Sequence, residues 1–254
     1  MLEINHLSKS FKLNNKQKKQ QGINEKFAVS NINLKLTGNQ IVAMIGSNGA
    51  GKSTTLRLLT GLLIPTQGEI KINGRNIFDD LQPARSTIGF ASDNTQLYLR
   101  LTVRENLTFF AKLYNMQASQ IKKRIDELSQ SMQFSDFLDK KINDCSTGMQ
   151  QKANIARALI HQPQLLILDE PTSGLDIKAA QTALNIIKAQ KNEHTLVIFS
   201  THHLHEVETL ADHIIAIEQA QCVFSGTPNQ FIEHFKGNSL YQAALNCAHN
   251  QIMN

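Results

Sequence analysis

Ile41-Val-Ala-Met-Ile45-Gly46-Ser-Asn-Gly-Ala-Gly-Lys-Ser-Thr54 is the stretch of sequence that decides the fold. It opens with an apolar run of strand length and is followed by leucines at roughly helical spacing, at positions 56, 58, 59 and 62. The segment between the two matches the phosphate-binding loop pattern GxxxxGK(S/T) without a gap. The order of strand, glycine-rich loop and helix therefore predicts an α/β fold with a phosphate site at this loop.

The residue types of the loop suit a bound triphosphate. Backbone amides wrap phosphate oxygens only where the chain turns sharply and approaches closely, which glycine permits at positions 46, 49 and 51. The helix that follows adds the positive end of its dipole. Lys52 supplies a positive charge for the β and γ phosphates, and Ser53 supplies a hydroxyl suited to Mg²⁺. The expected nucleotide contacts of the loop are Gly46, Ser47, Asn48, Gly49, Ala50, Gly51, Lys52, Ser53 and Thr54.

A second apolar run ends in two adjacent carboxylates. Leu165-Leu-Ile-Leu-Asp-Glu170 does not alternate with polar residues, which is typical of a strand in a parallel sheet covered on both faces. Ligands of such sheets bind beyond the carboxyl ends of the strands, so Asp169 and Glu170 are expected beside the phosphates. Asp169 is the candidate Mg²⁺ ligand and Glu170 the candidate base that polarises water. The phosphate loop alone leaves kinases, GTPases, helicases and transporter ATPases open, and the carboxylate pair favours hydrolysis.

Three further motifs occur in order: Cys145-Ser-Thr-Gly-Met149, Pro171-Thr-Ser-Gly-Leu-Asp176 and Phe199-Ser-Thr-His202. With the loop and the Asp-Glu strand, they make the chain resemble the nucleotide-binding subunit of ATP-binding cassette (ABC) transporters over nearly its whole length. The resemblance implies an α/β fold: a P-loop NTPase (RecA-like) core with a parallel sheet, an antiparallel β subdomain and a helical subdomain. The implied domains are 1–96 and 159–227 for the core with its antiparallel β subdomain, 97–158 for the helical signature subdomain, and 228–254 for a C-terminal tail.

The resemblance also assigns roles outside the phosphate loop. Ser146, Thr147 and Gly148 take the place of the signature motif, whose helix N-terminus reaches the γ phosphate held by a second subunit. Asp176 falls at the position that communicates across the dimer seam, and His202 matches the switch histidine that contacts the γ phosphate. The expected catalytic residues are therefore Glu170, His202 and Lys52.

Two assignments compete with simpler readings. Phe11 lies where the family places an aromatic ring that stacks on adenine, and Phe27 is the competing choice. His203 and His205 next to the switch histidine invite a metal interpretation. Without carboxylate or cysteine partners, one functional histidine with two incidental neighbours is favoured.

The chain departs from the family pattern at three positions. Thr147 replaces the first signature glycine and Met149 replaces the last signature glutamine. Asp93 replaces a glutamine that touches Mg²⁺ and links the core to the membrane partner; it still offers an oxygen to the metal but adds a charge. Ser-Thr-Gly-Met resembles the variant of exporter ATPases of the sodium-efflux, drug-efflux and haem-export kind. The expected metal ligands are Ser53, Asp169 and Asp93.

Together these features imply an ATPase that binds ATP and Mg²⁺, works as a head-to-tail homodimer or as a heterodimer with a similar ATPase, and powers a permease on a separate chain. Export at the cytoplasmic face of the membrane, with peripheral attachment, is the implied setting. The transported cargo is not encoded in this chain, because the substrate pathway lies in the permease.

Composition excludes several classes. No apolar stretch approaches the roughly 20 residues of a membrane-spanning helix. The three cysteines are odd in number and widely spaced, with no CxxC pair, which fits a reducing compartment. The net charge is +5, and the segment 9–26, with six lysines against one glutamate, accounts for all of it. The remainder is neutral, which argues against nucleic acid and against the alternative of a soluble ABC ATPase on ribosomes or DNA. A GTPase is disfavoured because no Asn-Lys-x-Asp motif follows the loop.

Overall fold

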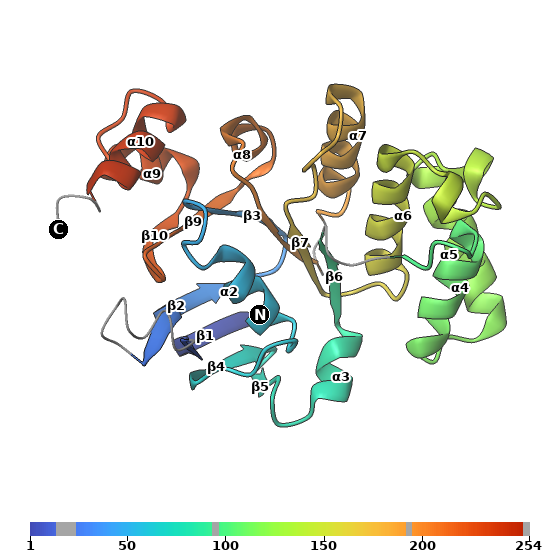
Figure 1. Cartoon of the computed structure of the whole chain (residues 1–254), viewed down its shortest axis with the longest axis horizontal. Coiled ribbons are helices and arrows are strands. Elements are labelled where there is room, and N and C mark those ends of the chain that lie inside the picture. The colour runs from blue at the N-terminus through green and yellow to red at the C-terminus, as the bar shows by residue number, and fades with distance from the viewer. Residues whose placement is uncertain (14–23, 93–96, 192–194, 251–254) are drawn as a thin grey trace.

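The computed structural model describes residues 1–13, 24–92, 97–191 and 195–250 and contains two β-sheets, the larger one flanked by helices (Figure 1). Of the basic segment 9–26, Lys16, Lys18 and Lys19 lie outside the described residues. The strands are β1 Leu2–Lys12, β2 Glu25–Leu36, β3 Gln40–Ile45, β4 Gln67–Ile72, β5 Arg75–Asn76, β6 Ile88–Ser92, β7 Leu165–Asp169, β8 Leu196–Ser200, β9 His213–Glu218 and β10 Gln221–Gly226. The α-helices are α2 Lys52–Leu59, α3 Leu81–Ser86, α4 Val103–Leu113, α5 Ala118–Ser131, α6 Thr147–Leu159, α7 Ile177–Lys188, α8 Leu204–Leu210, α9 Pro228–His234 and α10 Leu240–Asn250.

The larger sheet has the strand order β10-β9-β3-β8-β7-β6. Its neighbours pair in parallel except β9 and β10, which form an antiparallel hairpin. Every residue of β7 and β8 is buried, as an unbroken apolar run predicts for a sheet covered on both faces. The parallel pairing brings the carboxyl ends of β3, β7 and β8 to one edge of the sheet.

The smaller sheet is antiparallel, in the order β2-β1-β4-β5. Buried and exposed residues alternate along the end of β2, from Ile32 to Leu36. Because successive side chains of a strand point to opposite faces, this sheet packs against the core on one face only. The expected parallel core, antiparallel sheet and group of helices are thus all present.

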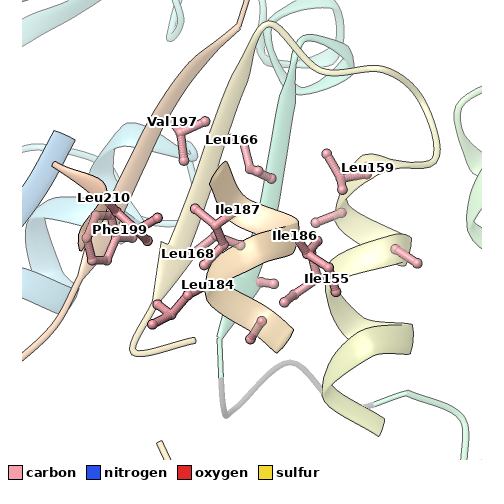
Figure 2. Packing of buried hydrophobic residues seen from close by; sticks show 14 of the residues in the cluster. Ile155, Leu159, Leu166, Leu168, Leu184, Ile186, Ile187, Val197, Phe199 and Leu210 are labelled. Carbon is pink, nitrogen blue, oxygen red and sulfur yellow. The ribbon is translucent and has the colours of Figure 1, made fainter. Parts of the chain in front are cut away.

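Residues of β3 pack alternately on the two faces of the larger sheet. Ile41, Ala43 and Ile45 join the cluster formed with α6, α7 and α8, whereas Val42 and Met44 join the cluster formed with α2 and the smaller sheet. Figure 2 shows the first cluster where α7 lies over β7 and β8. Each fully buried aliphatic side chain stabilises the fold by about 1.5–3 kcal/mol, so the strand ends that carry the site rest on a rigid core.

Helices α4, α5 and α6 lie together beyond β6 (Figure 1). His161, just after α6, connects these helices to the core. Its ring stacks on that of Tyr114, just after α4, at 3.7 Å between centroids. Burial lowers the pKa of His161 to about 4, so its ring is neutral at physiological pH, and Nε2 lies 3.1 Å from the carbonyl oxygen of Ile88. The helical segment is therefore fixed to the sheet by an uncharged polar contact.

The C-terminal segment, whose role the sequence leaves unread, is part of the main core. Side chains of α9 and α10 and of the turn between them are buried, namely Phe231, Phe235, Leu240, Ala243 and Cys247. Among the described residues, no helix combines the length and apolar character needed to span a bilayer.

Candidate nucleotide site

Three neighbouring strands of the larger sheet end side by side. Ser200, the last residue of β8, pairs with Asp169 of β7 on one side and with Met44 of β3 on the other. The phosphate loop follows β3, the carboxylate pair closes β7, and the switch segment follows β8. The topology therefore brings together residues that are more than a hundred positions apart in the sequence.

The glycines of the phosphate loop turn the chain and admit its neighbours. Gly46, Gly49 and Gly51 have φ values of 150°, 81° and 115°, which side chains disfavour. A Cβ at Gly46 would lie 2.0 Å from the carbonyl oxygen of Ile217, and one at Gly51 would lie 2.2 Å from that of Ala28. Gly49 has open space around it. Gly46 and Gly51 are thus required by the packing of the loop against neighbouring strands as well as by phosphate binding. The sequence pattern does not reveal this packing requirement.

Lys52 folds its side chain back over the loop. Its Nζ donates to the carbonyl oxygens of Gly46 at 2.8 Å and Ser47 at 3.1 Å, and the residue is only 6% exposed. The ammonium group is therefore held inside the turn of the loop, at the start of α2. A positive charge, a helix N-terminus and an open glycine at one place form an anion site.

Oxygen donors of the kind that Mg²⁺ prefers lie beside this lysine. Ser53 Oγ donates to Asp169 Oδ1 at 3.1 Å, and Ser200 Oγ donates to the same oxygen at 2.6 Å. Asp169 is buried, at 8% exposure. A serine hydroxyl and a carboxylate, both hard oxygen ligands, fit an octahedral Mg²⁺ that keeps water and phosphate oxygens as its other ligands.

Glu170 has a strained backbone and a histidine neighbour. Its φ is 49°, in the left-handed region that costs a non-glycine residue about 1–3 kcal/mol and is found at functional sites. Its backbone N–H donates to Ser200 Oγ at 2.9 Å. Glu170 Oε2 lies 3.5 Å from Nδ1 of His202, and both side chains are partly exposed. The two residues expected to act on water and on the γ phosphate are therefore in contact.

A carboxylate that the sequence analysis missed fixes the loop from behind. Glu218, at the end of β9, accepts hydrogen bonds from the backbone N–H of Ser47 at 2.8 Å and from its hydroxyl at 2.6 Å. In the β9–β10 turn, Ala220 donates its N–H to the carbonyl oxygen of Ala50. The sequence does contain a signal for Glu218: the apolar strand β9 ends in this acid, just as β7 ends in Asp169.

A second group of expected residues lies together at the starts of α6 and α7. Ser146 caps α6 and accepts from the N–H of Met149, while the sulfur of Met149 accepts from the N–H of Ser146. Asp176 caps α7 through the N–H of Ala179. Gly148 brings the helices close, because a Cβ there would lie 3.0 Å from the Cβ of Ala179. Met149 thus completes the cap in place of the family's glutamine.

The remaining candidates divide into three cases. Phe11 and Phe27 are 42% and 49% exposed, and the β1–β2 register pairs them with Lys26 and Ser10, so the rings lie on opposite faces of the hairpin. Asp93 lies outside the described residues. His203 packs against His202 at 3.9 Å between ring centroids. In the part of the chain that the structure describes, no three His, Cys, Asp or Glu side chains cluster as a metal site.

The profile of the ABC transporter family matches residues 29–173, which is more than half of the chain. The chain belongs to the ABC transporter family. It is similar to the ABC transporter ATP-binding protein NatA of Bacillus subtilis, with 36% identity over 84% of this chain and 87% of that protein. It is also similar to the linearmycin resistance ATP-binding protein LnrL of the same organism, with 33% identity over 87% of this chain and 71% of that protein.

Solved structures agree with this membership. The structure of an ATP-binding subunit of an ABC transporter superposes with a TM-score of 0.83 at 28% identity, covering 96% of this chain and 98% of that one. The dimeric structure of an ATP-binding cassette in a post-hydrolysis state, bound to ADP and phosphate, gives a TM-score of 0.78 at 26% identity over 89% of this chain and 98% of that one.

The protein is therefore an ATP-binding and ATP-hydrolysing ABC subunit that powers a separate membrane permease. The α/β fold of the P-loop NTPase class, expected from the sequence, is confirmed by these neighbours. The alternative of an ABC ATPase that acts on ribosomes or nucleic acid is not favoured, because the relatives compared are named as transporter subunits or resistance proteins.

Proposed function

We propose that the chain hydrolyses ATP with Mg²⁺ in a head-to-tail dimer, with a second copy or a similar ATPase, and that it drives export from the cytoplasmic face of the membrane. The observation that carries this proposal is the division of the expected residues into two groups. Lys52, Ser53, Asp169, Glu170 and His202 lie at the sheet edge, whereas Ser146 and Asp176 lie at the starts of α6 and α7 (Figure 1).

The sheet-edge group suits the chemistry of hydrolysis. Lys52 and the loop amides bind the phosphates, and Ser53 with Asp169 is suited to hold Mg²⁺, which supplies charge neutralisation when bound. Glu170 orients water and accepts its proton, and His202, in contact with Glu170, faces the same reacting phosphate. Phe11 is proposed for the adenine ring, with Asp93 as a further metal ligand.

The second group suits the completion of a partner's site. Ser146 combines a hydroxyl with the N-terminus of the 13-residue helix α6, which favours an anion. In Figure 1, α6 lies apart from α2, the helix that follows the phosphate loop. A head-to-tail copy would bring the Ser146 group of one chain over the Lys52 group of the other and exclude water from both sites.

A mixing experiment tests the dimer. Lys52→Ala removes the phosphate cation, and Ser146→Asp keeps a helix cap but places a negative charge where phosphate binds. Each variant alone is expected to be nearly inactive. A mixed dimer contains one intact site, and half of the dimers that form at random in an equimolar mixture are mixed. The equimolar mixture should therefore recover roughly a quarter of the parent ATPase activity.

The measurement is ATP turnover as the ratio of the two variants is varied at constant total protein. If sites were complete within single chains, the mixture would show only the average of two weak activities. That result would exclude the shared site while leaving the ATPase identity intact.

The permease is proposed to dock in a groove between the core and α4. The groove encloses a cavity of about 250 Å³ and has an aromatic and cationic lining. The guanidinium of Arg157 lies 4.9 Å from the ring centroid of Phe110, Arg85 donates to the carbonyl oxygen of Gly61, and Leu62 is 56% exposed at the rim. Apolar walls beside two cations fit a short helix that presents apolar side chains and a carboxylate. The lining residues are Thr60, Leu62, Arg85, Ile88, Phe90, Phe110, Tyr114, Arg157 and Ala158.

Leu62→Glu tests this docking surface. The substitution removes an apolar contact worth at most about 1.5–3 kcal/mol and places a carboxylate in the apolar contact, so co-sedimentation with membranes that contain the permease should weaken about tenfold or more. ATPase activity of the free protein should stay unchanged. The matched control is Ile64→Glu, which is 67% exposed in the same connection but does not line the groove. Equal sedimentation of both variants would place the permease elsewhere.

Export is favoured by the signature variant. Ser-Thr-Gly-Met resembles exporter ATPases, and one relative is named for resistance to linearmycin. The chain is also similar to the human retinal-specific phospholipid-transporting ATPase ABCA4, with 35% identity over 84% of this chain. The matched region covers only 9% of that much longer protein. The cargo itself is set by the permease.

A further inference from the structure

A buried carboxylate with no role so far lies behind the sheet-edge group. Glu206, on α8, is 5% exposed, and both of its oxygens are occupied. Oε1 accepts from the hydroxyl of Thr172 at 2.5 Å, and Oε2 accepts from the hydroxyl of Thr201 at 2.6 Å. Both threonines are buried, at 6% and 2% exposure. We name Glu206, Thr172 and Thr201 the carboxylate clamp.

The two threonines belong to the two segments that carry the reacting residues. Thr172 follows Glu170 by two positions in the turn after β7, and Thr201 directly precedes His202 after β8. The clamp therefore connects the segment of Glu170 to the segment of His202 through one side chain. Thr201 Oγ1 also accepts a hydrogen bond from the backbone N–H of His203 at 2.9 Å. This bond fixes the backbone of the switch segment directly after His202.

A contribution to stability alone is a poor explanation for this arrangement. Removing a carboxylate from water is costly, and an apolar side chain of similar volume would anchor α8 at least as well. What an apolar side chain cannot do is hold two hydroxyls from different segments at fixed positions. Short hydrogen bonds to a carboxylate are strong and directional, so the clamp sets the relative position of the two segments.

We propose that Glu206 is a positioning residue for ATP hydrolysis: through Thr172 and Thr201 it holds Glu170 and His202 at the spacing that the reaction needs. The proposal rests on the proposed function, since it takes Glu170 as the base and His202 as the phosphate contact. The observed 3.5 Å between Glu170 Oε2 and His202 Nδ1 is the spacing that the clamp maintains. Glu206 acts on both segments through the hydroxyls of the two threonines.

The decisive variant is Thr172→Val, which has the shape of threonine but lacks the hydroxyl. It should lower kcat about 10- to 100-fold, the effect of losing a hydrogen bond to a charged group or of a misplaced catalytic group. KM for ATP should change by less than about threefold, because the phosphate loop is untouched. Thr172→Ser, which restores the hydroxyl, should recover most of kcat. Glu208→Gln, an exposed glutamate two positions beyond Glu206, is the matched control and should match the parent.

A double substitution shows whether the clamp acts as a unit. Once Thr172→Val has broken it, adding Glu206→Gln should cost much less in kcat than Glu206→Gln costs alone. Thermal unfolding is measured for every variant to establish that it is folded at the assay temperature. If Thr172→Val is unfolded there, kcat of Glu206→Gln tests the clamp instead.

Two outcomes would overturn the clamp. One is a melting temperature that falls while kcat stays within about twofold of the parent in Thr172→Val and Glu206→Gln, since a structural role alone moves stability only. The other is a lower kcat that Thr172→Ser fails to recover. If Glu170→Gln is inactive while the clamp variants are fully active, only the clamp is wrong; if Glu170→Gln itself turns over normally, the proposed function is wrong.

Discussion

Glu170→Gln is expected to lower kcat for ATP hydrolysis by about 10²- to 10⁴-fold, the usual contribution of a general base, while ATP still binds. The amide has nearly the shape of the carboxylate, but it cannot take a proton from water. Lys52 and Ser53 are unchanged, so the phosphate contacts remain. The backbone of residue 170 stays in place because its N–H is bound by Ser200.

A second result should accompany the loss of turnover. With ATP bound but not consumed, the closed dimer has no route back to the open state, so gel filtration with ATP and Mg²⁺ should show a dimer that persists in Glu170→Gln and decays in the parent. Glu208→Gln, at an exposed glutamate of α8, controls for the loss of one carboxylate and should behave as the parent. Turnover at the parent rate would remove Glu170 from the role of base.

The parts of the site that the sequence predicts are those carried by short contiguous patterns. The phosphate loop lies between an apolar run and a helix, and Asp169 with Glu170 closes another apolar run. Because parallel strands end at the same edge of a sheet, these patterns were enough to place Ser53 beside Asp169, and the structure has their side chains 3.1 Å apart. The rule needs no knowledge of the residues between the patterns.

The parts that escaped prediction depend on pairs far apart in sequence and on single polar residues within apolar surroundings. Ser47 and Glu218 are separated by 171 positions, and nothing near either residue names the other. Glu206 lies on a short helix whose pattern is that of an ordinary surface helix, although the residue is buried. Such contacts are fixed by strand order and helix docking, which a single sequence does not encode locally.

The glycines show a subtler limit. Their spacing predicts a tight turn around phosphate, and the positive φ values fit that expectation. The contacts of Gly46 with Ile217 and of Gly51 with Ala28 add a different requirement, close packing against neighbouring strands. The pattern therefore explains the glycines only in part, because a motif contains no information about packing partners.

Lys52→Ala is expected to raise the Kd for ATP by about 10- to 100-fold, because a hydrogen bond to a charged group contributes about 1.5–3 kcal/mol. The ammonium is buried in the turn of the loop, where screening by water is weak, so little of its attraction to phosphate is lost to solvent. Hydrolysis should fall further than binding, since the same charge stabilises the reacting γ phosphoryl group.

The dependence on phosphate number makes this test specific. If Lys52 serves the β and γ phosphates, the variant should lose affinity for ATP and ADP but bind AMP as the parent does, which competition against a fluorescent ATP analogue measures. Lys35→Ala, in which a 75% exposed lysine of the same chain is removed, controls for the change in net charge and should leave all three affinities unaltered. An equal loss for AMP would mean that the loop has collapsed, because the carbonyl oxygens of Gly46 and Ser47 would have lost their donor. Unchanged ATP affinity would place the phosphates outside the reach of Lys52.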